Sequence, residues 1–219
     1  MTESSSFIET SVLVGYCILL DPHHSKCKSY INEDDRELYT SEGVREEYEN
    51  TRDSVSSRLS TAVFDHIRDL KSDAPQGYLG PMDVNNVKKN VLSRGNDAFQ
   101  FLYRYYSNVV DQGIPKEELE QNLRGIGRDI DRLVASREEK LDQMIEIWER
   151  QEEHPEVQNA LSMIHEPDRM WVIEAHDLAS NNDGHTEFAT TNPTDFVYEG
   201  RKNIVLENTA LDDVMDLSI

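Results

Sequence analysis

Six polar positions in this chain are candidates for a functional site because of where they fall relative to the expected strands and helices. Glu9 directly follows the apolar pair Phe7 and Ile8, which can end a short buried strand. Glu47 lies six residues after Ser41, on the helix expected to follow a second strand. The carboxyl ends of strands are where α/β folds build their sites. Both acids are therefore candidates for chemistry.

The other four positions lie in the last quarter of the chain. Glu174 and Asp177 are three residues apart, which places both carboxylates on one face of a helix. Asn192 and Asp195 bracket the turn expected after the next strand, and Asp195 can alternatively cap its own turn. An isolated acid in so acidic a chain is usually a solvated surface residue. The functional interpretation therefore rests on the joint placement of these side chains.

Two other kinds of catalytic site find little support in the sequence. His23 and His24 lie in an expected loop, and His176 is on a different helix face from Glu174 and Asp177. No pair of histidines has the helical zinc spacing with a glutamate base. The nucleophile elbow Gly-x-Ser-x-Gly, which is typical of Ser-His-Asp hydrolases, does not occur. Carboxylate chemistry remains the main candidate.

Composition limits the class of protein. The 219 residues include 43 Asp and Glu against 22 Lys and Arg, for a formal net charge of -21. This excludes a basic nucleic-acid coat and is typical of a surface adapted to a high-salt cytosol. The 37% hydrophobic content suffices for a core. The longest apolar run, 12–20, is too short to span a membrane. The start, 1–6, carries Glu3 and no cation, so we expect a cytoplasmic protein without a signal peptide.

The elements that must position the candidate residues begin with alternating strands and helices. A strand ending at 7–8, helices over 12–20 and 25–31, a strand over 37–40 and a helix over 42–58 are expected. Ser41 is a preferred N-cap for the last of these helices.

From about 54 to 164 nearly every segment has helical spacing, apart from a loop over 71–81 with two prolines and two glycines. A long amphipathic helix is expected between Pro115 and Pro155, with its apolar stripe continuing to Met144 and Trp148. Packing within one molecule is favoured over a dimerising coiled coil, because Arg137 interrupts the seam.

The C-terminal part returns to α/β character. We expect a helix over 169–182, a strand over 187–191, a turn over 192–195, another strand over 203–206 and a short acidic tail. Strands at both ends with helices between them predict one parallel sheet interrupted by a helical insertion.

Four short motifs in these segments resemble those of PIN-domain nucleases. Residues 7–14, Phe-Ile-Glu-Thr-Ser-Val-Leu-Val, are similar to the opening strand, acid and helix of that family. Residues 41–48, with Val44 and Glu47 in register, resemble its second motif. Residues 174–179 resemble the third, and 190–192 followed by Asp195 and Phe196 resemble the last. The resemblance covers about half of the chain.

The resemblance implies a PIN-like three-layer α/β fold over 1–60 and 165–219, with 61–164 as an all-helical insertion, in an acidic archaeal member of the family. Two positions depart from the family pattern, because Glu9 and Glu174 stand where Asp is usual. The extra methylene loosens the geometry at each position but keeps an oxygen ligand.

The activity implied by the resemblance is a Mg²⁺- or Mn²⁺-dependent endoribonuclease. Its implied catalytic residues are Glu9, Glu47, Glu174 and Asp177, its implied metal ligands are these four with Asn192 and Asp195, and its implied substrate-binding residues are Thr10, Thr191, Arg201 and Lys202. Hard divalent cations prefer such oxygen ligands, and a bound ion can activate water for phosphodiester hydrolysis.

The implied partners are an RNA substrate, an antitoxin protein if the chain is the toxin of a toxin-antitoxin pair, and a second copy in a homodimer. Two alternatives stay open: a PIN-fold binding or regulatory module that no longer cuts, and a structure-selective DNA nuclease. The negative charge opposes RNA binding at ordinary salt, but at molar salt the Debye length is only about 3 Å.

Overall fold

The computed structural model describes residues 4–18, 21–33, 35–73, 75–94, 97–108, 110 and 112–218. Its chain divides into two compact units. Unit 1 contains the described residues within 1–17, 23–51 and 137–219, and unit 2 those within 18–22 and 52–136. Leu19 and Leu20, the last two positions of the helix expected over 12–20, lie outside the described residues, as do residues 1–3. The two units are described separately.

Unit 1 contains all five strands of the larger sheet and most of the helices. Its elements are β1 (Ser4–Ile8), α1 (Thr10–Cys17), α2 (His24–Ile31), β2 (Arg36–Thr40), the start of α3 (Glu42–Asp73), the end of α6 (Lys116–Leu141), β5 (Ile145–Ile147), α7 (Pro155–Ala160), α8 (Asp168–Ser180), β6 (Thr186–Thr190), α9 (Pro193–Phe196), a 3-10 turn (Tyr198–Gly200), α10 (Arg201–Asn208) and β7 (Asp213–Asp216).

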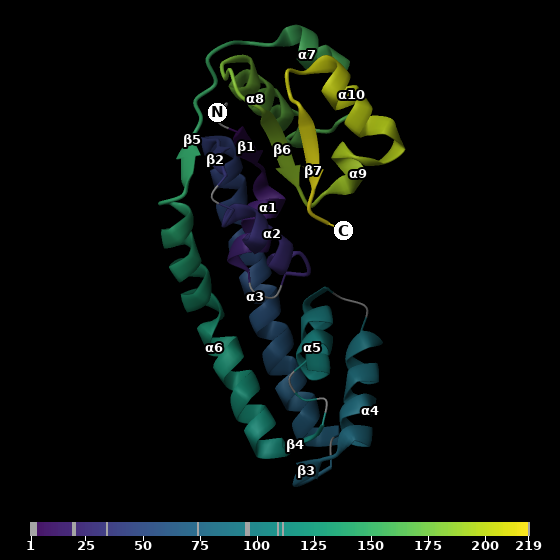
Figure 1. The fold of residues 1–219 in the computed structure, drawn as a ribbon. Helices are drawn as coiled ribbons and strands as arrows, with labels where there is room; N and C mark the ends of the chain where they lie inside the picture. The colour runs from purple at the N-terminus through teal and green to yellow at the C-terminus, as the bar shows by residue number, and fades with distance from the viewer. Residues whose placement is uncertain are drawn as a thin grey trace. The chain divides into compact units, whose positions relative to one another are not determined.

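All five strands run parallel, in the order β5-β2-β1-β6-β7 (Figure 1). The chain builds outward from β1 to β2 and β5, then returns to the other side of β1 to add β6 and β7. The order of strands therefore reverses between β1 and β6. In open α/β sheets, ligands bind outside the carboxyl ends of the strands at this kind of switch point.

Both faces of the sheet are covered. Neighbouring strand residues point to opposite faces, and Phe7 and Ile8 of β1 are both fully buried. Every residue of β6 is buried as well. Phe188 of β6 stacks on Phe7 at 6.2 Å between ring centroids and contacts Phe196 at 4.9 Å. The α/β class with a central parallel sheet, predicted from the sequence, is confirmed.

Unit 2 is almost entirely helical. It contains the rest of α3 and α6, with β3 (Tyr78–Leu79), α4 (Pro81–Leu92), α5 (Asp97–Asn108) and β4 (Ile114–Pro115). The strands β3 and β4 form a small antiparallel pair. Leu102 and Tyr106 of α5 and Leu119 and Leu123 of α6 are fully buried in the core. None of the described helices is both long and apolar enough to cross a membrane.

The boundary of the helical part differs from the predicted one. The expected insertion ran over 61–164, but residues from 137 onward belong to unit 1. The reason is β5, which pairs with β2 through Leu38 and Ile145 and so joins the sheet. The amphipathic stripe was expected to continue as helix to Trp148, but α6 ends at Leu141. A strand of three residues, such as β5, is too short to show a recognisable alternation of apolar and polar residues in the sequence.

Other predicted elements were wrong at specific places. The segment 203–206, expected as a strand, lies inside α10, because a short apolar run has no periodicity that separates strand from helix. The acidic tail over 212–216 contains β7, which pairs with β6 and buries Val214. The expected loop over 71–81 contains the end of α3 and the whole of β3.

Candidate functional site

Glu9 lies one residue beyond β1, beside the switch point, and only 3% of its surface is exposed. Three donors hold its carboxylate. The Thr190 hydroxyl donates to Oε1 at 2.8 Å and the Ser11 backbone N–H donates to Oε2 at 2.7 Å. The Ser11 hydroxyl also donates to Oε1. Thr190 ends β6, so the two strands at the switch point share this carboxylate.

The electrostatic environment of Glu9 opposes its charge. Burial raises the pKa of Glu9 to about 7, although the hydrogen bonds from Ser11 and Thr190 act in the opposite direction, and the nearby carboxylate of Asp168 raises it further. At neutral pH the side chain is therefore held near its protonation midpoint. A cation placed beside it would favour the charged form.

Glu47 is brought to the same region by α3. Ser41 caps this helix, as predicted, since its hydroxyl accepts the Val44 N–H at 3.3 Å. The Thr10 hydroxyl and the Trp171 indole N–H, the latter at 3.0 Å, both donate to Oε2 of Glu47. The other carboxylate oxygen, Oε1, receives neither of these hydrogen bonds.

Asp168 is the first residue of α8 and was not among the predicted site residues. Burial raises its pKa to about 6, and the neighbouring carboxylates of Asp195 and Glu47 raise it further. Asp168 thus interacts electrostatically with Glu9, Glu47 and Asp195. We refer to these four side chains as the carboxylate cluster.

Asp195 is partly exposed, with 26% of its side chain accessible to solvent. Asn192 donates its side-chain N–H to Oδ2 of Asp195 at 2.7 Å, and Arg201 donates to Oδ1 at 3.2 Å. The Asn192 backbone N–H donates to the Thr190 hydroxyl at 2.8 Å. The turn expected over 192–195 thus links Asp195 to the end of β6, and Arg201 brings one positive charge to the edge of the cluster.

A resident divalent cation would need several oxygen ligands gathered at one place. In the part of the chain that the structure describes, no three His, Cys, Asp or Glu side chains are arranged as a ready metal site. The chemistry of the donor set nevertheless fits a hard cation, because four carboxylates share one region and two of them have raised pKa values.

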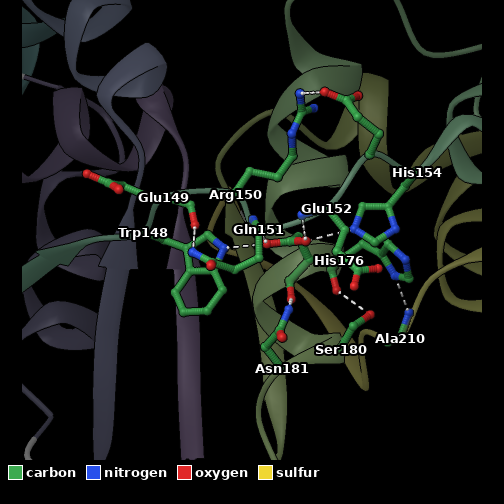
Figure 2. Close-up of polar contacts among 12 residues, drawn as sticks. Trp148, Glu149, Arg150, Gln151, Glu152, His154, His176, Ser180, Asn181 and Ala210 are labelled. Atoms are coloured by element: carbon green, nitrogen blue, oxygen red, sulfur yellow. Dashed lines mark hydrogen bonds and ion pairs between the residues drawn. The ribbon is translucent and has the colours of Figure 1, made fainter.

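Asp177 has hydrogen-bond partners of its own, and Figure 2 labels four of them: Trp148, Gln151, Glu152 and His154. The Trp148 indole N–H and the Gln151 backbone N–H donate to Oδ2 at 2.9 and 2.8 Å, and the Glu152 backbone N–H lies 3.1 Å from Oδ1. His154 Nε2 is 2.8 Å from Oδ1. These contacts share no residue with those given above for Glu9.

The geometry of α8 explains why Asp177 and Glu9 are separated. A helix rises 1.5 Å per residue, so Asp177 lies about 13 Å along the axis from Asp168. Asn182, just beyond the end of α8, donates to the Ser5 hydroxyl at 2.7 Å, at the start of β1. The C-terminal end of α8 is therefore at the amino edge of the sheet, whereas Glu9 is at the carboxyl edge. The predicted grouping of Asp177 with Glu9 is replaced by the grouping of Asp168 with Glu9.

Glu174 is hydrogen-bonded to Ser41, the residue after β2, and interacts electrostatically with Asp177. Burial raises its pKa, a hydrogen bond from Ser41 and the charge of Arg150 lower it, and Asp177 raises it again. Its Oε2 atom is buried with no hydrogen-bond partner among the described residues. Of the six predicted metal ligands, Glu9, Glu47, Asn192 and Asp195 are linked through shared partners or through Asp168. Asp177 has partners of its own, and Glu174 interacts with Ser41, Arg150 and Asp177.

The predicted substrate-binding residues have other contacts. Thr10 donates to Glu47, and the Thr191 hydroxyl donates to the Ser11 hydroxyl at 2.7 Å, so both hydroxyls support the cluster. Lys202 donates to the Val214 carbonyl at 3.0 Å and pairs with Asp213, both on β7.

A sequence signal for Asp168 was present. An acid directly after a proline, at the first position of a helix, suits the positive end of the helix dipole. A helix that leads into a parallel strand runs antiparallel to it, so the start of this helix had to lie near the carboxyl edge of the sheet. The expected helix began at residue 169, one residue too late to include Asp168.

No family model, no curated protein and no solved structure matches the chain.

Proposed function

We propose that this protein is a divalent-metal-dependent phosphodiesterase of the PIN-like type that cleaves RNA. The observation that carries the proposal is the carboxylate cluster of Glu9, Glu47, Asp168 and Asp195 beside the switch point of a parallel sheet, where burial and, to a smaller extent, neighbouring carboxylates raise the pKa of Glu9 and Asp168. Buried like charges are costly unless a cation offsets them. Perturbed carboxyl groups gathered at one point are typical of functional sites.

The strand order supports the PIN-like part of the proposal. Across the sheet, the five parallel strands of unit 1 follow the order β5-β2-β1-β6-β7, which is 3-2-1-4-5 when they are numbered along the chain. Glu9, the acid of the opening motif, follows the central strand β1. Asp168 also improves the agreement with the motif pattern, because it restores an aspartate as the third acid, where Glu174 departed from the family.

The side chains of the cluster have distinct proposed roles. Glu9, Glu47 and Asp168 would hold Mg²⁺ or Mn²⁺ through carboxylate oxygens, with Asp195 and Asn192 at its edge. The bound ion would supply an activated water and offset the charge of the scissile phosphate. Ser11 and Thr190 orient Glu9, and Thr10 orients Glu47. Arg201, beside Asp195, is the proposed contact for a substrate phosphate.

The test is cleavage of a labelled single-stranded RNA with Mn²⁺, in low and molar salt, by the wild-type protein and Glu9→Gln. We expect Glu9→Gln to lose activity while its circular dichroism stays unchanged. Glu146→Gln, on an exposed position of β5, is the matched control and should cleave like wild type. Equal cleavage by wild type and Glu9→Gln would disprove the proposed role of Glu9.

The same assay separates the alternatives. Flapped and single-stranded DNA offered beside the RNA would reveal a DNA nuclease by preferential cleavage of the DNA. A binding module that no longer cuts would leave every substrate intact and would take up no Mn²⁺ at millimolar concentration.

A further inference from the structure

Trp171 connects two helices that carry members of the carboxylate cluster. It lies three residues after Asp168 on α8, so the two side chains share a helix face. Its indole N–H donates to Glu47 of α3 at 3.0 Å, and only 7% of the residue is exposed. One buried side chain next to Asp168 in the helix thus reaches the carboxylate of Glu47.

The six-membered ring of the same indole occupies the place of a missing side chain on α3. Gly43 lies one helical turn before Glu47, on the same face. A Cβ atom at Gly43 would lie 2.7 and 2.8 Å from Cζ3 and Cη2 of Trp171, closer than such atoms approach in proteins. Only glycine therefore lets the ring lie against α3 at this point. The indole spans one turn of α3, from Gly43 to Glu47.

The hydrogen bonds to Glu47 also orient its carboxylate. Trp171 and Thr10 both donate to Oε2, which directs these two contacts to one oxygen and leaves Oε1 outside them. Hydrogen-bond donors of this kind fix metal-binding carboxylates in productive orientations.

We propose that Trp171 is a positioning residue for a divalent cation: packed in the notch at Gly43, it fixes the spacing of α3 and α8 and so the relative placement of Glu47 and Asp168. The inference rests on the proposed function, since it assumes that these carboxylates bind a cation. Trp171 itself contacts neither ion nor substrate in this account.

The chain provides a matched control for each substitution. The second tryptophan, Trp148, also donates its indole N–H to a carboxylate, that of Asp177 at 2.9 Å, outside the cluster. Gly125 is also a helical glycine, but a Cβ there would have no neighbour within 4 Å. Each substitution therefore has a control that makes the same chemical change away from the carboxylate cluster. Trp148→Phe is the control for Trp171→Phe, and Gly125→Ala is the control for Gly43→Ala.

The experiment is calorimetric titration of the full chain with Mn²⁺, with thermal unfolding of each variant measured in EDTA. We expect Trp171→Phe and Gly43→Ala to raise the Kd for Mn²⁺ about 10-fold or more, the usual effect of losing a side chain that orients a ligand. The two controls should stay within about twofold of wild type, even if Trp148→Phe unfolds at a lower temperature.

Fluorescence keeps the inference testable if Trp171→Phe does not fold. In Trp148→Phe the remaining tryptophan is Trp171, because the chain has only two. Its emission should change on addition of Mn²⁺ with the Kd found by calorimetry.

The outcomes are distinct. If wild type binds no Mn²⁺, the proposed function fails and the positioning role fails with it. If wild type binds Mn²⁺ but Gly43→Ala and Trp171→Phe bind it as tightly as their controls, or if Trp171 emission does not respond, the positioning role alone is disproved.

Discussion

Two buried carboxylates of unit 1, Glu9 and Asp177, have nearly the same exposure and opposite electrostatics. Glu9 is 3% exposed and its pKa is raised to about 7, whereas Asp177 is fully buried and its pKa is lowered. Burial raises the pKa in both cases. At Asp177 the hydrogen bonds from Gln151, His154, Trp148 and Glu152 outweigh it.

The difference shows how a structural acid can be told from a candidate functional one. Asp177 has a donor for each oxygen and holds the segment after β5 onto α8, so its charge is already compensated. Glu9 has donors too, but it shares its surroundings with Asp168, and that region has an excess of negative charge. An acid that remains uncompensated after folding is the better candidate for a cation ligand.

The largest expected effect is on RNA cleavage, which should depend on the carboxylate cluster and not on acids elsewhere in unit 1. Asp168→Asn should lower Mn²⁺-dependent RNA cleavage by roughly 100-fold or more, because it removes a charged ligand from the proposed site. Asp183→Asn, an exposed acid beyond the other end of α8, should leave cleavage unchanged. The measurement is the initial rate of cleavage at saturating Mn²⁺. Equal rates for Asp168→Asn and Asp183→Asn would remove Asp168 from the site.

The second prediction concerns the free energy of unfolding, to which Asp177 should contribute. Asp177→Asn should lower the free energy of unfolding by about 3 kcal/mol, because an amide N–H₂ replaces an acceptor that faces donors. The lowered pKa means that this stabilisation is present at neutral pH and is lost as pH falls through the folded-state value. Urea unfolding at pH 7 measures it. The folded fraction of Asp177→Asn should still cleave RNA. If Asp177→Asn is as stable as wild type, the structural role of Asp177 is contradicted.

The opposite sign is expected at Glu9. The pKa of Glu9 rises from 4.5 to about 7 on folding, so between these values the unfolded chain loses its proton first and stability falls as pH rises. Glu9→Gln removes this penalty and should be more stable than wild type at pH 8 in EDTA, by about 1 to 3 kcal/mol, and nearly equal to it at pH 4. Glu146→Gln, at an exposed position of β5, is the control variant. Urea unfolding at both pH values measures the free energy of unfolding. A difference between Glu9→Gln and wild type that is the same at pH 4 and pH 8 would contradict the prediction.

A smaller effect is expected from the cation itself. Millimolar Mn²⁺ should raise the unfolding temperature of wild type at pH 8 by a few degrees, because a ligand that binds only the folded state stabilises it. Asp177 should not take part, so an Asp177→Asn protein should gain as much as wild type. An equal gain in Asp168→Asn and wild type would place the binding elsewhere.

The sheet could be predicted from the sequence where local patterns were strong. Phe7 and Ile8 before an acid, and Ser41 before a helix, identified β1 and the start of α3 correctly. The strands β5 and β7 could not be predicted, because three- and four-residue segments containing acids owe their structure to pairing with β2 and β6. Such pairing is a long-range property that a local pattern does not encode.

Two members of the carboxylate cluster followed from the sequence pattern, and Asp168 did not. Glu9 and Glu47 followed from their positions after β1 and on α3. Glu174 and Asp177 were predicted because their spacing gives a shared helix face, whereas Asp168 lies just before the helix expected over 169–182. Helix direction is the information that was missing: α8 ends beside the start of β1, where Asn182 donates to Ser5, so Asp168 at its beginning lies on the side of Glu9.

The most direct test of the carboxylate cluster as a cation site is calorimetric titration of the wild-type protein with Mn²⁺ at pH 6.5, in two buffers of different ionisation enthalpy. We expect saturable binding with release of protons, because a cation lowers the raised pKa values of Glu9 and Asp168, and loss of that binding in Asp168→Asn. Absence of binding at millimolar Mn²⁺, or binding without proton release that Asp168→Asn leaves unchanged, would contradict the account.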